Sequence, residues 1–420
     1  QRITWKTTAK NTTKAKIKLT VYDSTNSPKD ALEMTIPVKS YSVPETVATS
    51  GEAKDTSSEN IVLPKDLDPS QGNASVSLTP SLGSDSTRAL SYLFDYPYYC
   101  VEQTTSRFMP AIFVHRITRD LQTTDDDYID NDSMVSVIND GIQRLNNQQH
   151  SDGGWGWWTE YESNAFLTAY VYQALLEAKS DKFVVSDSTL DKASTFLEYQ
   201  LARRSKDISL DVQAYILYVL RKDNLKLASY AANLYDRRYE LSLESRAYLA
   251  IALKDIPSQS NHARRIYNEL ISLGKKTSTT IHWEDPKRDY QMMGSNTTTT
   301  ASMLEAMSLF DKNSPLIAET IRYLMSTRID NHWPSTRDTA SAIKAISTQL
   351  LTKNDQKLDE NYKIELNGKN IVDGVFTKND LFKLREYVIS ITDLNIGGES
   401  NLKISKSGTG NLYYNINLKY

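Results

Sequence analysis

The chain has 420 residues, 39% of them hydrophobic and 24% charged, which is enough apolar material for the cores of two or three domains. Its 49 basic residues nearly balance its 52 acidic residues and are scattered, so it lacks the basic face that a nucleic-acid-binding protein needs to displace counterions from phosphates. No apolar run approaches the length of about 20 residues that crosses a bilayer, so we expect no membrane span.

Residues 1–72 are predicted to be β-structure. Ile17, Leu19 and Val21 alternate with polar residues, which is the period of a half-buried strand. The polar stretch 49–60 is predicted to be a loop. The N-terminal residues lack the apolar stretch of a signal peptide, so we expect a fragment of a longer chain whose targeting information lies elsewhere.

Residues 73–352 are predicted to be helical, because their apolar residues recur at helical spacing. The clearest segments are 166–178, 211–220, 244–253, 299–310 and 337–347. Each opens with a polar or acidic residue or follows one, and each is rich in alanine and large apolar residues. With a further helix near Cys100, they predict about six helical hairpins in a repeat architecture. An α/α toroid with the alanine-rich helices inside is the closed form that we expect.

Residues 353–420 return to the strand period. Tyr362, Ile364 and Leu366 alternate with polar residues and precede an Asn-Gly pair, which is a strong hairpin signal. The segment from Leu412 to the end alternates throughout. Neither β-portion has many strands alone, so we predict that 1–72 and 353–420 form one antiparallel β-sandwich into which the toroid is inserted. The strands around Ile17 and Leu412 should then share a core.

The chain has one cysteine, Cys100, so an internal disulfide and a cysteine zinc site are both excluded. A lone cysteine is usually a buried small hydrophobe. Gln103 follows three residues later, at the expected start of a helix. Attack of the Cys100 sulfur on the Gln103 side-chain carbonyl, with loss of ammonia, would close a thioester, which is an activated acyl group. The helix N-terminus would stabilise the thiolate when the sulfur leaves.

The wider segment YPYYCVEQTTSR, residues 96–107, resembles the thioester signature of the α2-macroglobulin and complement family, and its bacterial branch in particular. Three other segments are also similar to that family: DGGWGWW at 152–158, WPSTRDTA at 333–340 and the tail from residue 408. In this family the thioester domain is an α/α toroid inserted into a CUB-like β-sandwich. The resemblance therefore implies the same order of β, α and β segments that the periodicity predicts.

The resemblance implies roles for particular residues. Cys100 and Gln103 match the thioester pair, and Tyr96 matches a tyrosine that shields the bond in bacterial members. Glu102 occupies the usual acidic position of the motif and is assigned no chemistry. The tryptophans of the 152–158 segment either line the shield or pack the toroid.

The resemblance also implies a function. The chain is expected to be part of a broad-spectrum protease inhibitor that reacts once with lysine amines of its target proteases, so it is not an enzyme and needs no cofactor or metal. Macroglobulin-like domains and a protease-sensitive bait region should precede it in the full-length chain. We expect an extracytoplasmic, periplasmic location, with a lipoprotein anchor left open.

Histidines bear on the choice of target. Some complement members use a histidine of the toroid, roughly a hundred or more residues after the glutamine, to pass the acyl group to hydroxyls. None lies between His150 and His262, and none of the five histidines matches a motif: His115, His150, His262, His282 and His332. Direct reaction with lysine amines, rather than transfer to carbohydrate, is therefore predicted.

Three alternatives to this function are weighed against the sequence. QQHSDGGW at 148–155 resembles the Gln-to-Trp repeat of terpene cyclases, and Asp125–Asp127 would then be an acidic initiating site. That element occurs once, however, and the aspartates lie in a loop-like stretch. Zinc chemistry of the prenyltransferase type would need the only cysteine as a ligand. A structural member of the family with an inactive thioester is the third alternative.

Overall fold

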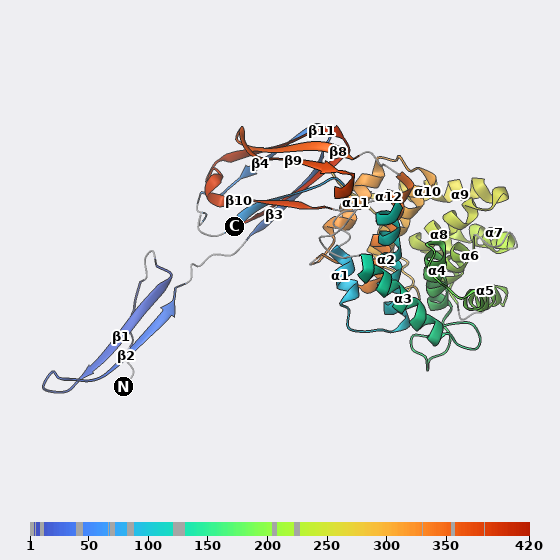
Figure 1. The fold of residues 1–420 in the computed structure, drawn as a ribbon, viewed down its shortest axis with the longest axis horizontal. Coiled ribbons are helices and arrows are strands. Elements are labelled where there is room, and N and C mark those ends of the chain that lie inside the picture. Colours follow the sequence, from blue (N-terminus) through green and yellow to red (C-terminus); the bar gives the residue numbers. More distant parts are fainter. Residues whose placement is uncertain are drawn as a thin grey trace.

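A computed structural model describes residues 4, 6–8, 12–38, 45–65, 67, 72–81, 88–120, 131–203, 208–221, 227–329, 331–353, 358–381 and 383–420. It contains a helical domain, an antiparallel β-sandwich and a separate β-hairpin (Figure 1). The predicted fold class is confirmed: an α/α toroid is inserted into a β-sandwich. No helix in the described part of the chain is long and apolar enough to cross a membrane.

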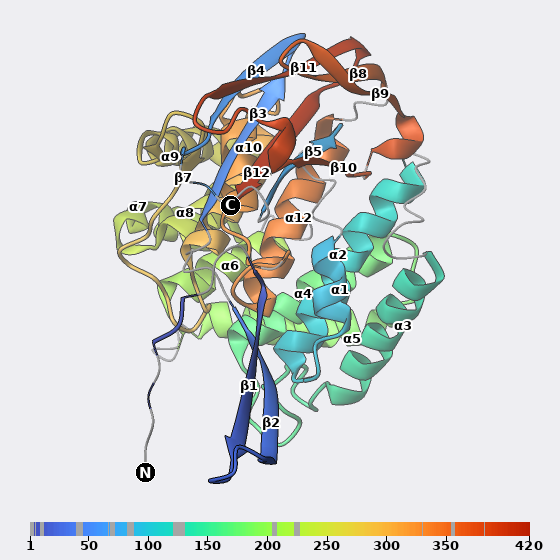
Figure 2. The same ribbon diagram turned by 90° about the vertical axis from the view of Figure 1, so that its left-hand side faces the viewer.

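Six helices form the inner ring of the toroid, and each packs against the next until the last meets the first. In ring order they are α2 (Val101–Asp120), α4 (Ala165–Ser180), α6 (Leu210–Leu220), α8 (Leu243–Lys254), α10 (Asn296–Phe310) and α12 (Thr336–Lys353). Figure 2 shows the ring from a second side. The contact between α12 and α2 brings the two ends of the helical segment together.

The outer helices pack against this ring. They are α1 (Arg88–Phe94), α3 (Asn131–Gln148), α5 (Asp187–Ala202), α7 (Ala228–Asp236), α9 (Ser260–Ser272) and α11 (Leu316–Ser326). Helix α6 is buried on all sides, whereas α9 buries only Ala263, Ile266, Tyr267 and Leu270, which lie on one face. A helix that is apolar on all sides is expected in the inner ring, and a helix with one apolar face is expected in the outer layer. The distribution of apolar residues in each helix therefore predicts its layer.

Three tryptophans attach inner helices to outer ones in the same way. The indole N–H of Trp155 donates to the Leu145 carbonyl of α3 at 2.8 Å, and its backbone N–H donates to the Thr168 hydroxyl of α4 at 3.0 Å. Trp283 and Trp333 repeat both bonds before α10 and α12. All three side chains are fully buried. Trp155 therefore packs the toroid, which is one of the two roles predicted for the tryptophans of its segment.

Two buried ion pairs lie among the inner helices. Lys344 bonds Glu305 at 2.6 Å, and Arg337 bonds Glu244 at 2.7 Å, with all four side chains at most 8% exposed. Burial opposes the ionisation of Glu305, but Lys344 holds the pKa of that carboxyl below its usual range. Lys344 and Glu305 join α12 to α10, and Arg337 and Glu244 join α12 to α8.

The sandwich consists of two four-stranded antiparallel sheets, in the orders β10-β5-β12-β3 and β4-β11-β8-β9. Its strands are β3 (Thr46–Ala53), β4 (Thr56–Val62), β5 (Asn73–Thr79), β8 (Asp359–Leu366), β9 (Lys369–Thr377), β10 (Arg385–Ser390), β11 (Glu399–Thr409) and β12 (Leu412–Lys419). Strands from both ends of the chain pair directly, as β12 does with β3 and β5. The alternating residues of β12 fill the core between the sheets.

Three predictions about the β-portions are wrong. Residues 49–60 form most of β3 and β4 instead of a loop, and β5 belongs to the sandwich although residues from 73 onward were assigned to the toroid. The strand containing Ile17 does not share the core of Leu412. It is β1 (Lys14–Tyr22), which pairs only with β2 (Pro28–Pro37) among the described strands.

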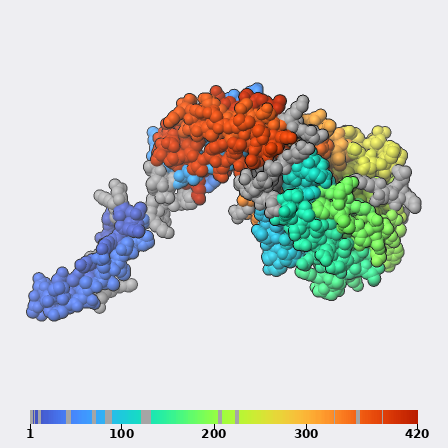
Figure 3. Space-filling view, in the orientation of Figure 1, coloured from blue at the N-terminus to red at the C-terminus, as the bar shows by residue number. Residues whose placement is uncertain are grey.

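The β1–β2 hairpin stands apart from the sandwich and the toroid (Figure 3). Its apolar side chains are 41–57% exposed: Ile17, Leu19, Val21, Tyr22, Leu32, Met34 and Ile36. The alternation in this segment is therefore real, but it does not contribute to the sandwich core.

Candidate functional site

The N-terminus of α2 brings Cys100 and Gln103 together. The Cys100 carbonyl accepts the first helical bond, from the Thr104 N–H at 2.9 Å, so Cys100 is the N-cap residue. The Cys100 N–H donates to Gln103 Oε1 at 3.2 Å, and the Gln103 N–H donates to Cys100 Sγ at 3.5 Å. This reciprocal pair is a capping box in which cysteine replaces the usual serine or threonine. The capping geometry itself therefore holds the sulfur beside the side-chain amide.

Cys100 is protected from solvent. Its side chain is buried, with 6% of the residue exposed, while Gln103 is half-buried. Burial raises the pKa of the Cys100 thiol, and backbone N–H groups of Gln103 and Glu102 that face the sulfur act in the opposite direction. A free thiol at this position therefore stays protonated at neutral pH, while the two N–H groups are placed to stabilise a thiolate when one forms.

Two of the segments that resemble the thioester family meet this helix start. The Val101 N–H donates to the Trp157 carbonyl at 3.1 Å, so the 152–158 segment satisfies an amide of the first turn. The Thr336 hydroxyl donates to both carboxyl oxygens of Glu102 at 3.0 Å. The 333–340 segment, which contains the start of α12, is therefore hydrogen-bonded to the first turn of α2.

Glu102 is the site residue that sequence reasoning undervalued. It is 4% exposed and also accepts a bond from Ser106 at 2.6 Å, and Ser106 in turn bonds Tyr170 at 2.9 Å. Burial raises the pKa of Glu102, although the Ser106 and Thr336 hydroxyls oppose this shift. An acidic residue in the first turn of a helix was the available signal, but its partner Thr336 lies 234 positions away.

The raised pKa of Glu102 predicts a pH-dependent stability. The folded protein binds this proton more tightly than the unfolded chain, so the contribution is full at low pH and is lost as pH rises through the folded pKa. Relative to Glu102→Gln, the wild type should lose stability from about pH 4 upward. Urea unfolding of both proteins across that range measures the difference. Glu160→Gln, at an exposed glutamate, is the control and should track the wild type. A constant difference between wild type and Glu102→Gln would contradict the assignment.

An aromatic cluster lies before Cys100. Tyr96 is half-buried and packs edge-on against Tyr92 and Tyr98, with ring centroids 5.6 Å and 6.0 Å apart. His332 stacks on Tyr92 at 3.7 Å. Tyr96 lies in the loop that leads to α2, four residues before Cys100. Its shielding role stays a prediction.

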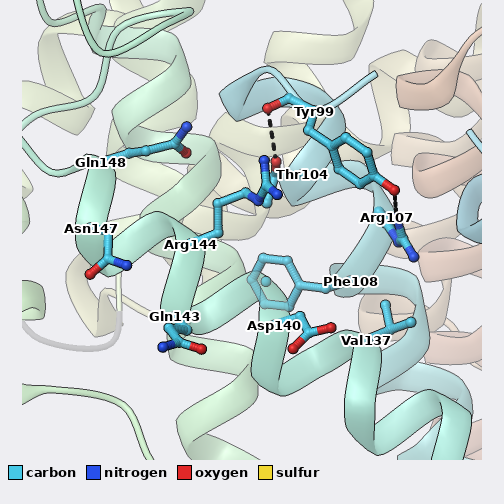
Figure 4. Close-up of a pocket in the computed structure, with 11 residues that line it drawn as sticks. Tyr99, Thr104, Arg107, Phe108, Val137, Asp140, Gln143, Arg144, Asn147 and Gln148 are labelled. Atoms are coloured by element: carbon cyan, nitrogen blue, oxygen red, sulfur yellow. Dashed lines mark hydrogen bonds between the residues drawn. The ribbon is translucent and has the colours of Figure 1, made fainter. Parts of the chain in front are cut away.

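Tyr99, which immediately precedes Cys100, lines a pocket (Figure 4). The pocket has a volume of about 550 Å³ and lies between α2 and α3. The Arg107 guanidinium donates to the Tyr99 hydroxyl at 2.7 Å, and the Arg144 guanidinium lies over its ring at 4.6 Å. A Cβ at Gly141 would come within 2.7 Å of Phe108, so this glycine permits the close approach of the two helices.

Comparison with known proteins places this site in a family. Residues 76–207 match the family model described as the A-macroglobulin TED domain. The α2-macroglobulin of Thermotoga maritima is 26% identical over 262 residues, which cover 61% of this chain and 14% of that protein. The homologue from Yersinia pestis is 32% identical over 131 residues, 31% of this chain and 6% of that protein. The family model and these relatives support the bacterial α2-macroglobulin family for this chain. It spans a small part of the length of these relatives.

Solved α2-macroglobulins have the same fold. The native Escherichia coli protein, from domain MG7 to the C-terminus, matches with a TM-score of 0.61 and 17% identity over 97% of this chain and 62% of that chain. Salmonella α2-macroglobulin reacted with methylamine matches with a TM-score of 0.60 and 16% identity, over 97% of this chain and 26% of that chain. At this identity the likeness concerns the fold, and it includes both the toroid and the β-portions.

The other residues singled out in the sequence lie outside this site. His115 bonds Asp181, His262 stacks on Tyr235 and His282 stacks on Tyr323. His150 bonds Ser163 at 2.9 Å. Asp125–Asp127 lie outside the described residues, so the acidic site of the cyclase alternative has no structural account.

Proposed function

We propose that Cys100 and Gln103 form an internal thioester, and that this chain is part of a protease inhibitor that attaches to its targets through it. The observation that carries the proposal is the reciprocal capping pair, with bonds of 3.2 Å and 3.5 Å between the two residues. The match of residues 76–207 to the A-macroglobulin TED domain supports it, because that range contains both residues.

The proposed chemistry has two steps. In the first, Cys100 Sγ attacks the Gln103 carbonyl carbon, the carbon–sulfur bond forms and ammonia leaves with the thiol proton. In the second, an amine attacks the same carbon, the carbon–sulfur bond breaks and the amine proton passes to the sulfur. The acyl group ends as an amide, which is far less reactive than the thioester. One molecule therefore reacts once.

Lysine amines are the proposed acceptors. Among the described residues, no histidine is hydrogen-bonded to Cys100 or Gln103, and His332 reaches the cluster only through Tyr92. Nothing in this arrangement redirects the acyl group to a hydroxyl. The target class is then proteins with accessible lysines, and the family supports proteases as those proteins.

The rest of the molecule is proposed from the relatives. They are several times longer than this chain, which supports macroglobulin-like domains elsewhere in the full-length protein. We assign the β-sandwich as the CUB-like domain and the described helices as the thioester domain. An extracytoplasmic, periplasmic location suits a protease trap, and a lipoprotein anchor stays open.

Protease conjugation tests this function. The chain should form an adduct with a lysine-rich protease that survives boiling in detergent and reductant. Hydroxylamine should not cleave the adduct, because an amide resists it whereas an ester does not. Prior dimethylation of the protease lysines should abolish the adduct. A hydroxylamine-labile adduct, or one that forms with blocked lysines, would show that lysine is not the acceptor.

Tyr96→Ala tests the shield. Removing this ring opens a path for water, so the thioester should hydrolyse at least several-fold faster in amine-free buffer. The rate of thiol appearance measures hydrolysis. Tyr161→Ala removes a ring that is 57% exposed and should leave the rate unchanged. Equal rates in both variants would show that Tyr96 only packs.

A further inference from the structure

The pocket between α2 and α3 carries two arginines and adjoins the thioester loop. Tyr99, on its wall, immediately precedes Cys100, and Thr104 immediately follows Gln103. The Arg107 and Arg144 guanidinium groups contact the same tyrosine, one at its hydroxyl and one at its ring. Two of the residues that line the pocket therefore flank the reacting pair.

Within the described part of the chain, the two arginines of this pocket are not ion-paired. Among the described residues, neither Arg107 nor Arg144 forms an ion pair with a carboxylate, although Asp140 also lines the pocket. In Figure 4 the Arg144 guanidinium lies near Tyr99 and Thr104, while the Asp140 carboxylate lies beyond the Phe108 ring. The end of the pocket nearest the loop is thus the cationic one.

Helix geometry places this charge within reach of an amine at Gln103. Arg107 is four residues after Gln103 on α2, so their Cβ atoms lie about 5–6 Å apart on one face. Planar guanidinium groups bind carboxylates with paired hydrogen bonds. An amine that attacks the Gln103 carbonyl and carries a carboxylate a few bonds away can place that carboxylate on Arg107 and Arg144.

We propose that this pocket is a carboxylate subsite of the thioester, which selects amines that have a neighbouring acidic group. On a protein target these are lysines next to aspartate or glutamate. The inference rests on the thioester proposed above. The two arginines repel an ammonium group that approaches alone, and a neighbouring carboxylate removes that repulsion.

Matched small amines test the subsite. γ-Aminobutyrate and its uncharged amide have the same chain and differ at the carboxyl end. At low salt, γ-aminobutyrate should release the Cys100 thiol about three to ten times faster, which is the range expected from one partly exposed ion pair. High salt should reduce the ratio, because it screens exposed charges. Arg144→Gln and Arg107→Gln should bring it towards one.

Control variants and amines separate the possible outcomes. Arg203→Gln removes another exposed arginine that lies over a tyrosine ring, outside this pocket, and should retain the preference. Equal rates for the two amines in the wild type, while methylamine still releases the thiol, would overturn the subsite and leave the thioester standing. A preference that persists in both pocket variants would overturn it as well. No thiol release with any amine would overturn the thioester and the subsite together.

Discussion

Arg337→Met is expected to destabilise the toroid by about 3–5 kcal/mol, because it leaves a buried carboxylate without its partner. Glu244 is 3% exposed, and Arg337 is its only cationic partner among the described residues. The Thr298 hydroxyl also donates to that carboxylate, at 2.8 Å, but a hydroxyl does not neutralise its charge. The urea midpoint, followed by tryptophan fluorescence, measures the loss, since five of the six tryptophans lie between residues 155 and 333.

Two further variants separate the ion pair from simple loss of packing. The double variant Arg337→Met with Glu244→Gln should recover part of the loss, because no buried charge remains uncompensated. Arg237→Met breaks an exposed pair with Glu240 and should leave the midpoint unchanged within error. A midpoint for Arg337→Met equal to that of the wild type would show that Glu244 is not held as an ion in the core.

Cys100→Ala is expected to abolish amine incorporation completely. Without sulfur nothing activates the Gln103 carbonyl, and an ordinary amide does not react with methylamine under mild conditions. Peptide mapping of the segment around residue 103 after incubation with methylamine measures incorporation. The same variant should form no adduct with a protease.

Gln103→Glu is the matched variant at the other half of the pair. It keeps the sulfur but cannot lose ammonia, so its thiol should titrate in denaturant before any amine is added. The wild-type thiol should titrate only after the amine has reacted. Incorporation of methylamine in Cys100→Ala would mean that another group activates this carbonyl.

The toroid could be predicted because burial leaves a distinct pattern in each layer. Inner helices such as α6 are apolar all round, whereas α9 has a single apolar face. The β-portions were harder, because a period of two shows that a strand is half-buried but not what covers it. Hence the strand of Ile17 was assigned to a core that it does not reach.

Edge position explains the strands that were predicted to be a loop. Strands β3 and β4 each lie at the edge of their sheet, where polar residues are tolerated and protect against further pairing. Only Ala53 of β3 and Ile61 of β4 are buried. Their composition therefore resembles that of a loop, although both pair along their length with strands from the C-terminal part of the chain.

Part of the candidate site could likewise be predicted from the sequence, and the rest depended on the fold. Cys100 and Gln103 could be found from spacing, because an N-cap residue and the third residue of a helix always lie side by side. The bond from Thr336 to Glu102 depends on closure of the ring between α12 and α2. No local sequence pattern predicts this contact between α12 and α2, so the role of Glu102 could be seen only in the fold.

Intact mass before and after methylamine tests the thioester most directly. Freshly purified protein should be lighter than its sequence mass by one ammonia, and methylamine should then add once, with the appearance of one thiol. An initial mass equal to the sequence mass, a thiol that titrates before amine is added and no gain of mass with methylamine would together contradict the account.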